Sequence, residues 1–197
     1  MEGIIEPVAV IILAAGRSER MKEFKALLPF EGKTRFLDKI LQTYSNWGCQ
    51  EIVVVTNPEA FTEMKKLEMI PFKVKVVIND RLELERFYSV KLGLSALTDT
   101  AFCFLQNVDN PFIDESILDT IYQNRSHGAY VSPVFNHKGG HPVLLNRQGI
   151  KTLNKWSDLA ANLKDILHTI ECKRVEMPDN RVLININSPE EYKRYFI

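Results

Sequence analysis

The strongest constraint on the fold is the alternation of two patterns along the chain. Short apolar runs rich in β-branched residues, such as the run at 8–13, alternate with longer segments that have the 3.6-residue periodicity of helices. The early runs are apolar at nearly every position, which is typical of strands covered by helices on both faces. This order predicts an α/β fold, a three-layer α/β/α sandwich around a mostly parallel, twisted, Rossmann-like sheet with right-handed crossovers.

The same patterns give the expected element bounds. The predicted strands span 8–13, 51–56, 74–78, 101–105, 129–133, 141–145, 173–176 and 182–186. The predicted helices span 35–47, 58–67, 83–97, 114–124, 148–154, 159–168 and 189–195. A hairpin-like connection at 136–140 joins two of the strands. Because no repeat, low-complexity tract or linker divides the sequence, we expect a single domain over residues 1–197.

Composition argues against several classes of partner, although overall charge balance leaves a local basic patch open. Lys and Arg number 25, as do Asp and Glu, and a net charge of zero argues against nucleic acid held by a general basic surface. Three widely spaced cysteines without a CxxC pair argue against structural zinc or a disulfide framework. The first ten residues lack the basic start of a signal peptide, and no run reaches the ~18 apolar residues of a membrane helix. We therefore expect a cytoplasmic protein without a membrane partner.

Ligands of open parallel sheets bind beyond the carboxyl ends of the strands, so the loops after residues 13, 78, 105 and 186 are the candidates. The first loop lacks the GxGxxG and P-loop patterns but combines small residues with cations. It contains Leu13, Ala14, Ala15, Gly16, Arg17, Ser18, Arg20 and Lys25. Small residues let backbone N–H groups approach anionic oxygens, and cations neutralise a polyphosphate. On composition alone, a surface loop with solvated charges fits equally well.

Two further loops carry candidate metal ligands. Asp109 follows the strand at 101–105, and a single carboxylate there suits Mg²⁺, which also takes oxygens from substrate phosphates. The alternative is that Asp109 caps the next helix or marks a turn. Asn187 lies where the last predicted strand meets the last helix, and its amide oxygen is a candidate second ligand. Helix capping is the strong alternative for Asn187.

Two other segments are suited to contact a substrate. Gly140 and His141 follow another glycine, Gly139. Two adjacent glycines are equally consistent with a ligand that approaches the backbone closely and with a tight hairpin turn. Asn79 and Ser89 flank the start of a helix and could face a nucleotide. Gly93 inside that helix costs about 1 kcal/mol relative to alanine, which indicates close packing or a nearby ligand.

Taken in order, these segments resemble the MobA-like NTP transferase family, which includes molybdenum cofactor cytidylyltransferases, within the nucleotide-diphospho-sugar transferase-like fold. The opening signature LAAGxSxRMGxxKxLLP aligns with residues 13–29 with every spacing kept. The family's serine-containing helix start, its xDxP loop, its GHPV segment and its closing N/D-x-N/D-[ST]-PE element match residues 87–93, 108–111, 140–143 and 185–190. The resemblance thus covers nearly the whole chain.

The resemblance implies an enzyme that transfers CMP from CTP to molybdopterin or its molybdenum-loaded form and releases pyrophosphate, with Mg²⁺ as cofactor. It implies that Arg20, Lys25 and Asp109 are catalytic and that Asp109 and Asn187 hold the metal. The implied nucleotide-binding residues are Leu13, Ala14, Ala15, Gly16, Arg17, Ser18, Lys25, Asn79 and Ser89. The implied acceptor-binding residues are Gly140, His141 and Asn185. A client molybdenum hydroxylase is the implied protein partner.

Three departures from the family pattern keep other functions open. Lys22 replaces a glycine, Glu85 and Arg86 replace a Gly-Met pair, and Asn185 and Asn187 stand where many cytidylyltransferases have aspartates. Neutral amides bind Mg²⁺ more weakly than carboxylates do. The alternatives are GTP as donor, a sugar or polyol phosphate as acceptor, and a catalytically silent NTP- or pterin-binding accessory protein.

Overall fold

The computed structural model describes residues 6–69, 71, 73–84 and 86–197, and its centre is a sheet of eight strands. Seven of them follow the order β10-β7-β9-β6-β1-β4-β5, and β8 pairs with β7. The strands are β1 (Val8–Ala14), β4 (Glu51–Thr56), β5 (Val74–Ile78), β6 (Phe102–Asn107), β7 (Tyr130–Phe135), β8 (Lys138–Gly139), β9 (Val143–Asn146) and β10 (Cys172–Glu176). Strand β1 is parallel to β4 and β6, β4 to β5, and β10 to β7, whereas β9 runs antiparallel to β6 and β7.

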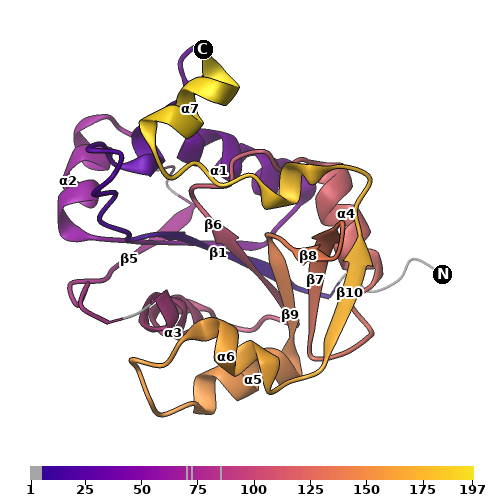
Figure 1. Cartoon of the computed structure of the whole chain (residues 1–197). Helices are drawn as coiled ribbons and strands as arrows, with labels where there is room; N and C mark the ends of the chain where they lie inside the picture. The colour runs from indigo at the N-terminus through magenta and orange to yellow at the C-terminus, as the bar shows by residue number, and fades with distance from the viewer. Residues whose placement is uncertain (1–5, 70, 72, 85) are drawn as a thin grey trace.

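Helices cover both faces of this sheet (Figure 1). One face carries α1 (Phe36–Trp47), α2 (Pro58–Lys66) and α4 (Glu115–Gln123), and the other carries α3 (Arg86–Ala96), α5 (Arg147–Lys155) and α6 (Leu163–His168). The remaining elements are the 3₁₀ helices η1 (Lys25–Leu27) and η2 (Asn180–Leu183), the strand pair β2 (Pro29–Glu31) and β3 (Thr34–Arg35), and α7 (Pro189–Phe196). The predicted three-layer, mostly parallel architecture is confirmed. No helix within the described residues is long and apolar enough to cross a membrane.

Strand β1 shows why the early apolar runs are continuous. Val10 and Ile12 belong to the cluster under α1, α2 and α4, while Ala9 and Ile11 belong to the cluster under α3, α5 and α6, and all four are fully buried. A Cβ on Gly93 of α3 would lie 2.5 Å from Cγ2 of Ile11. Close packing of α3 on β1 therefore accounts for this glycine.

The predicted strand at 182–186 is wrong, because this segment forms η2 and then an extended connection to α7. Its polar backbone groups are satisfied without a partner strand. The side chain of Asn110 donates to the carbonyls of Arg181, Val182 and Ile184, and the N–H of Ile186 donates to the carbonyl of Asp109. The apolar alternation that suggested a strand reflects the burial of Val182 and Ile186.

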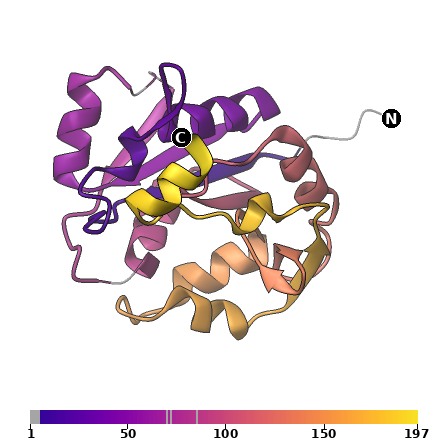
Figure 2. The same ribbon diagram turned by 45° about the horizontal axis from the view of Figure 1, so that its top comes forward.

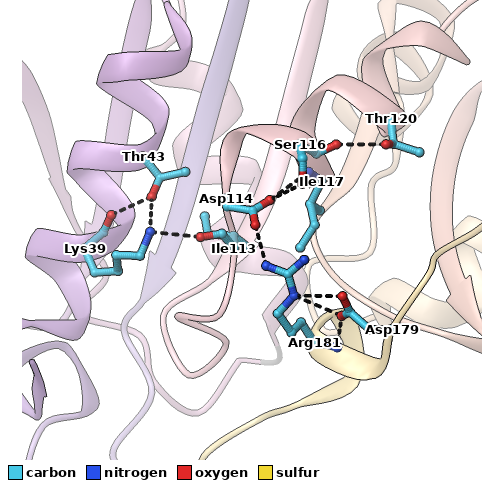
Figure 3. A network of polar contacts seen from close by, with 9 residues as sticks. All are labelled: Lys39, Thr43, Ile113, Asp114, Ser116, Ile117, Thr120, Asp179 and Arg181. Carbon is cyan, nitrogen blue, oxygen red and sulfur yellow. Dashed lines mark hydrogen bonds and ion pairs between the residues drawn. The ribbon is translucent and has the colours of Figure 1, made fainter.

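A polar network fixes η2 against α4 and lies beside α1 (Figure 3). Asp114 caps α4 by accepting from the N–H of Ile117 at 3.0 Å, and its other oxygen pairs with Arg181 of η2. Partial burial raises the pKa of Asp114, but hydrogen bonds from Ser116, from Ile117 and from Arg181 lower it to about 2. The carboxylate therefore stays charged at neutral pH and anchors the segment that leads to α7.

Candidate active site

A cavity of about 530 Å³ opens at the carboxyl ends of β1, β5 and β6. This volume lies within the range of small-molecule and cofactor sites, about 300–1,000 Å³. The cavity is lined by every residue that the sequence predicted to be catalytic, nucleotide-binding or metal-binding. These are Leu13, Ala14, Ala15, Gly16, Arg17, Ser18, Arg20, Lys25, Asn79, Ser89, Asp109 and Asn187.

The centre of the site is the ammonium group of Lys25. Its Nζ donates to Oδ2 of Asp109 at 2.9 Å and to Oδ1 of Asn187 at 2.7 Å. The Lys25 and Asp109 side chains are each 16% exposed, so this ion pair is partly shielded from water. Lys25 begins η1, Asp109 follows β6, and Asn187 precedes α7. Three distant segments therefore place one cation and two oxygen ligands within hydrogen-bonding distance.

Helix α7 holds these three segments together through an aromatic cluster. Tyr192 and Phe196 pack against Phe30, Phe36 and Phe112, which lie near Lys25 and Asp109 in the chain. The hydroxyl of Tyr192 also donates to the carbonyl of Pro29 at 2.9 Å. Figure 2 shows α7 lying across the molecule beside the segment that follows β1. Burial of these rings fixes the relative positions of the site segments.

The donor set around Asp109 fits a divalent cation that substrate oxygens complete. Oδ2 of Asp109 accepts from Lys25, but Oδ1 is buried and has no hydrogen-bond partner among the described residues. Those residues also contain no group of three or more His, Cys, Asp or Glu side chains placed to hold a metal. Mg²⁺ sites of kinases and polymerases commonly use one or two carboxylates plus substrate phosphates. One carboxylate and the amide oxygen of Asn187 match that chemistry.

The loop after β1 makes a tight turn next to this centre. The N–H groups of Met21 and Lys22 donate to the carbonyl of Ser18 at 2.9 and 3.0 Å, and Ser18 Oγ accepts from the N–H of Lys25 at 3.3 Å. Lys22 has a φ of +61°, the left-handed conformation that favours glycine. A lysine therefore occupies a backbone conformation that would suit the glycine of the family signature. Arg20 is exposed and lines the cavity.

Asn79 and Ser89 also line the cavity. Asn79 is buried, and its Nδ2 donates to Oγ of Ser89 at 2.8 Å.

Asn57, which the sequence did not predict to be a site residue, supports the loop after β1. The side chain of Asn57 caps α2 through Oδ1 and donates through Nδ2 to the carbonyl of Ala15 at 3.2 Å. The capping pattern before Pro58 indicated only the first of these two bonds.

Comparison with known proteins identifies the family. Residues 10–175 match the sequence profile of the MobA-like NTP transferase domain. The chain belongs to this family.

Similar proteins of the MobA-like family and fold are nucleotidyltransferases. The chain is 27% identical over 186 residues to the molybdenum cofactor cytidylyltransferase of Escherichia coli, covering 92% of each chain. It is 26% identical over 200 residues to the 2-C-methyl-D-erythritol 4-phosphate cytidylyltransferase of Fusobacterium nucleatum, covering 96% of this chain and 74% of that protein. The crystal structure of Rv0371c from Mycobacterium tuberculosis shares the fold, with a TM-score of 0.84 at 18% identity over 98% of each chain. This MobA-like chain is therefore a nucleotidyltransferase.

The residues predicted to bind the acceptor lie outside the lining of the main cavity. A Cβ on Gly140 would lie 2.4 Å from the carbonyl oxygen of Val182, so a close backbone crossing accounts for this glycine. The N–H of His141 donates to the same carbonyl at 2.9 Å, and its ring Nδ1 is buried without a partner among the described residues. Asn185 lines a second cavity of about 330 Å³ beside β8 and α7.

Burial and, to a smaller extent, the positive charge of Arg86 lower the pKa of His141 to about 4, while Asp109 opposes the shift. His141 is therefore neutral at physiological pH. Arg86, at the start of α3, is also a lining residue of the main cavity that sequence analysis noted only as a departure from the family pattern. Glu85, the other half of that departure, lies outside the described residues.

Proposed function

We propose that this MobA-like nucleotidyltransferase transfers CMP from CTP to the phosphate of molybdopterin or of its molybdenum-loaded form, and releases pyrophosphate. The observation that carries the proposal is the position of Lys25 between Asp109 and Asn187, in a cavity that the small-residue loop at 13–18 also lines. A fixed cation beside oxygen ligands suits a reaction in which negative charge moves between phosphates.

In the proposed reaction, an oxygen of the acceptor phosphate attacks the α-phosphorus of the nucleotide. The bond from this phosphorus to the bridging oxygen of the β-phosphate breaks, and pyrophosphate leaves with the electron pair. The attacking phosphate is already an anion, so the chain needs no general base, and positioning and charge stabilisation provide the rate. Lys25 and Arg20 offset the charge on the α-phosphate and on the pyrophosphate.

The remaining lining residues bind and orient the nucleotide in this proposal. Backbone groups of residues 13–15 face the base, and N–H groups of residues 16–18 hold phosphate oxygens. Asp109 and Asn187 would hold Mg²⁺, which supplies charge neutralisation at the phosphates when bound. The cation density of Arg17, Arg20 and Lys25 along one loop supports a triphosphate as the donor.

CTP is the proposed donor because the loop reads Leu-Ala-Ala-Gly and because the Escherichia coli relative is a cytidylyltransferase. A polyol phosphate acceptor is the second candidate, favoured by the name of the Fusobacterium relative. A cytoplasmic location and delivery of the product to a client molybdenum hydroxylase belong to the same proposal.

The deciding experiment measures pyrophosphate release with Mg²⁺, molybdopterin and each of the four NTPs in turn. Release with CTP and no other NTP supports the proposal, and release with GTP alone assigns the chain to guanylyl transfer. Release with CTP and 2-C-methyl-D-erythritol 4-phosphate, but not with molybdopterin, would favour the second candidate. NTP binding without any release would overturn enzymatic activity in favour of an accessory role.

A further inference from the structure

A buried glutamine precedes Asp109 by three positions. Gln106 is the fifth residue of β6, and its side chain is fully buried. Phe102 and Phe104 precede it on the same face of the strand and belong to the apolar cluster under α1. An apolar side chain would continue that pattern, whereas a buried amide needs hydrogen-bond partners. Hydrophobic packing therefore does not explain a glutamine at this position.

The hydrogen bonds of Gln106 fix the turn that carries Asp109. Its Nε2 donates to the carbonyl of Asn107 at 2.8 Å and to the carbonyl of Asn110 at 2.9 Å. These carbonyls lie before and after Asp109 in the chain. Its Oε1 accepts from the hydroxyl of Tyr44 in α1 at 3.0 Å, and this tyrosine is fully buried. One side chain thus holds both ends of the turn and connects the turn to the core.

A second buried amide connects the same turn to the segment that carries Asn187. Asn110 is fully buried, and its Nδ2 donates to three carbonyls within residues 181–184 at distances from 2.8 to 3.3 Å. The N–H of Ile186 donates to the carbonyl of Asp109 at 2.8 Å, one residue before Asn187. The two segments that carry the proposed metal ligands are therefore joined at two places.

The amide of Asn110 is satisfied on one side only. Its Oδ1 is buried and has no hydrogen-bond partner among the described residues. An unpaired buried acceptor costs free energy. The favourable part of this side chain is therefore its nitrogen, and every hydrogen bond that the nitrogen donates goes to the segment leading to Asn187.

Asn146, at the end of β9, is a comparable amide at the opposite edge of the sheet. Its Oδ1 caps α5 by accepting from two backbone N–H groups, and its Nδ2 donates to the carbonyl of Gly128 at 2.7 Å. Asn146 pairs with Phe102, the first residue of β6, whereas Asp109 lies beyond the last. The chain thus offers a control amide with as many backbone contacts and no connection to the site.

We propose that Gln106 and Asn110 are positioning residues that hold Asp109 and Asn187 at the separation that one divalent cation requires. The inference rests on the proposed function, because it concerns the metal ligands of that reaction. Neither amide is among the residues that line the cavity, so both act through the backbone of the ligand-bearing segments. Loss of the groups that orient metal ligands typically costs about 10–100-fold in metal affinity or activity.

The first test measures Mn²⁺ binding by electron paramagnetic resonance in the complex with CTP, or with GTP if the wild type binds GTP instead. Gln106→Met keeps the length of the side chain, loses its hydrogen bonds and is expected to weaken Mn²⁺ binding about tenfold or more. Asn110→Ala should act in the same direction. Tyr44→Phe leaves the bonds from Gln106 to the turn and should have a smaller effect, and Asn146→Ala should have none. Equal Mn²⁺ affinities in the wild type and Gln106→Met, or no Mn²⁺ binding by the wild type, would overturn the inference.

The second test needs no ligand and separates a local effect from a general loss of stability. Amide hydrogen exchange, followed by NMR, reports on the N–H of Ile186, which bonds to the carbonyl of Asp109. In Asn110→Ala, this N–H is expected to exchange about tenfold faster, while the core amides of β1 and β4, which report on global unfolding, change less. A uniform increase at all of these amides would mean that Asn110 only stabilises the fold.

Steady-state kinetics separates this inference from the proposed function. In Gln106→Met, kcat for pyrophosphate release is expected to fall about tenfold, with the KM for the nucleotide nearly unchanged because the loop at 13–18 is intact. A raised KM with an unchanged kcat would contradict a role in placing the metal ligands. Absence of release by the wild type would count against the proposed function alone, since Mn²⁺ binding and hydrogen exchange do not depend on turnover.

Discussion

The Nζ atom of Lys25 lies 2.7 Å from Oδ1 of Asn187, although 162 positions separate the two residues in the chain. The same Nζ contacts Asp109, so one ammonium group bridges the two side chains proposed as metal ligands. In this arrangement the lysine neutralises the carboxylate while no substrate is bound. When phosphates enter, the lysine can exchange these contacts for phosphate oxygens without crossing the cavity. In the proposed reaction, the lysine therefore links metal binding and phosphate binding at one point.

Replacement of Lys25 by alanine is expected to lower turnover by about 10²–10³, because one fixed charge that stabilises the transition state is lost. The variant should still fold, with a stability loss of about 1–3 kcal/mol from the unpaired Asp109 carboxylate. Pyrophosphate release with CTP and molybdopterin measures the first effect, and thermal unfolding measures the second. Lys22→Ala, at an exposed position outside the cavity lining, is the control. Near-normal turnover in Lys25→Ala would exclude the proposed role.

Asn187→Asp is expected to strengthen metal binding, because a second carboxylate adds a charge–charge attraction that the amide lacks. The Mg²⁺ concentration for half-maximal activity should fall several-fold. Binding of Mn²⁺ to the CTP complex, followed by electron paramagnetic resonance, gives a readout that does not depend on turnover. Asn185→Asp is the matched control, since Asn185 lines a separate cavity. The same shift in both variants would show that the effect is general electrostatics rather than ligation.

The parts of the site that were predictable share one physical cause. Parallel strands bring the loops at their carboxyl ends to one edge, so residues after β1, β5 and β6 could be grouped without coordinates. The bond from Asn57 to Ala15 was not predictable, because the capping of α2 already explains an asparagine before Pro58. The prediction of a strand at 182–186 was wrong for a related reason. The backbone carbonyls of this segment are satisfied by the side chain of Asn110 instead of a neighbouring strand, and Asn110 is 71 or more positions away in sequence from the carbonyls it binds.

Gly140→Ala is expected to destabilise the fold by about 1–3 kcal/mol, in the range of overpacked core positions. The added Cβ would lie 2.4 Å from the backbone oxygen of Val182, which cannot move aside as a flexible side chain can. Gly139→Ala is the matched control, since the nearest atom to its added Cβ is 3.5 Å away. Urea unfolding of the two variants tests the difference. Equal stabilities, together with a raised KM for the acceptor in Gly140→Ala, would assign Gly140 to the acceptor instead.

His141 is expected to make stability depend on pH in the acid range. Burial and Arg86 lower its pKa in the folded protein from 6.5 to about 4, so between these values the unfolded chain binds a proton that the folded chain does not. Stability is then complete above the unfolded pKa and falls as pH decreases toward 4, by at most about 1.4 kcal/mol per pH unit. Urea unfolding at a series of pH values measures this slope. His141→Gln should reduce it, whereas His127→Gln, at an exposed histidine, should leave it unchanged. An unaltered slope in His141→Gln would mean that other groups control the acid sensitivity of the fold.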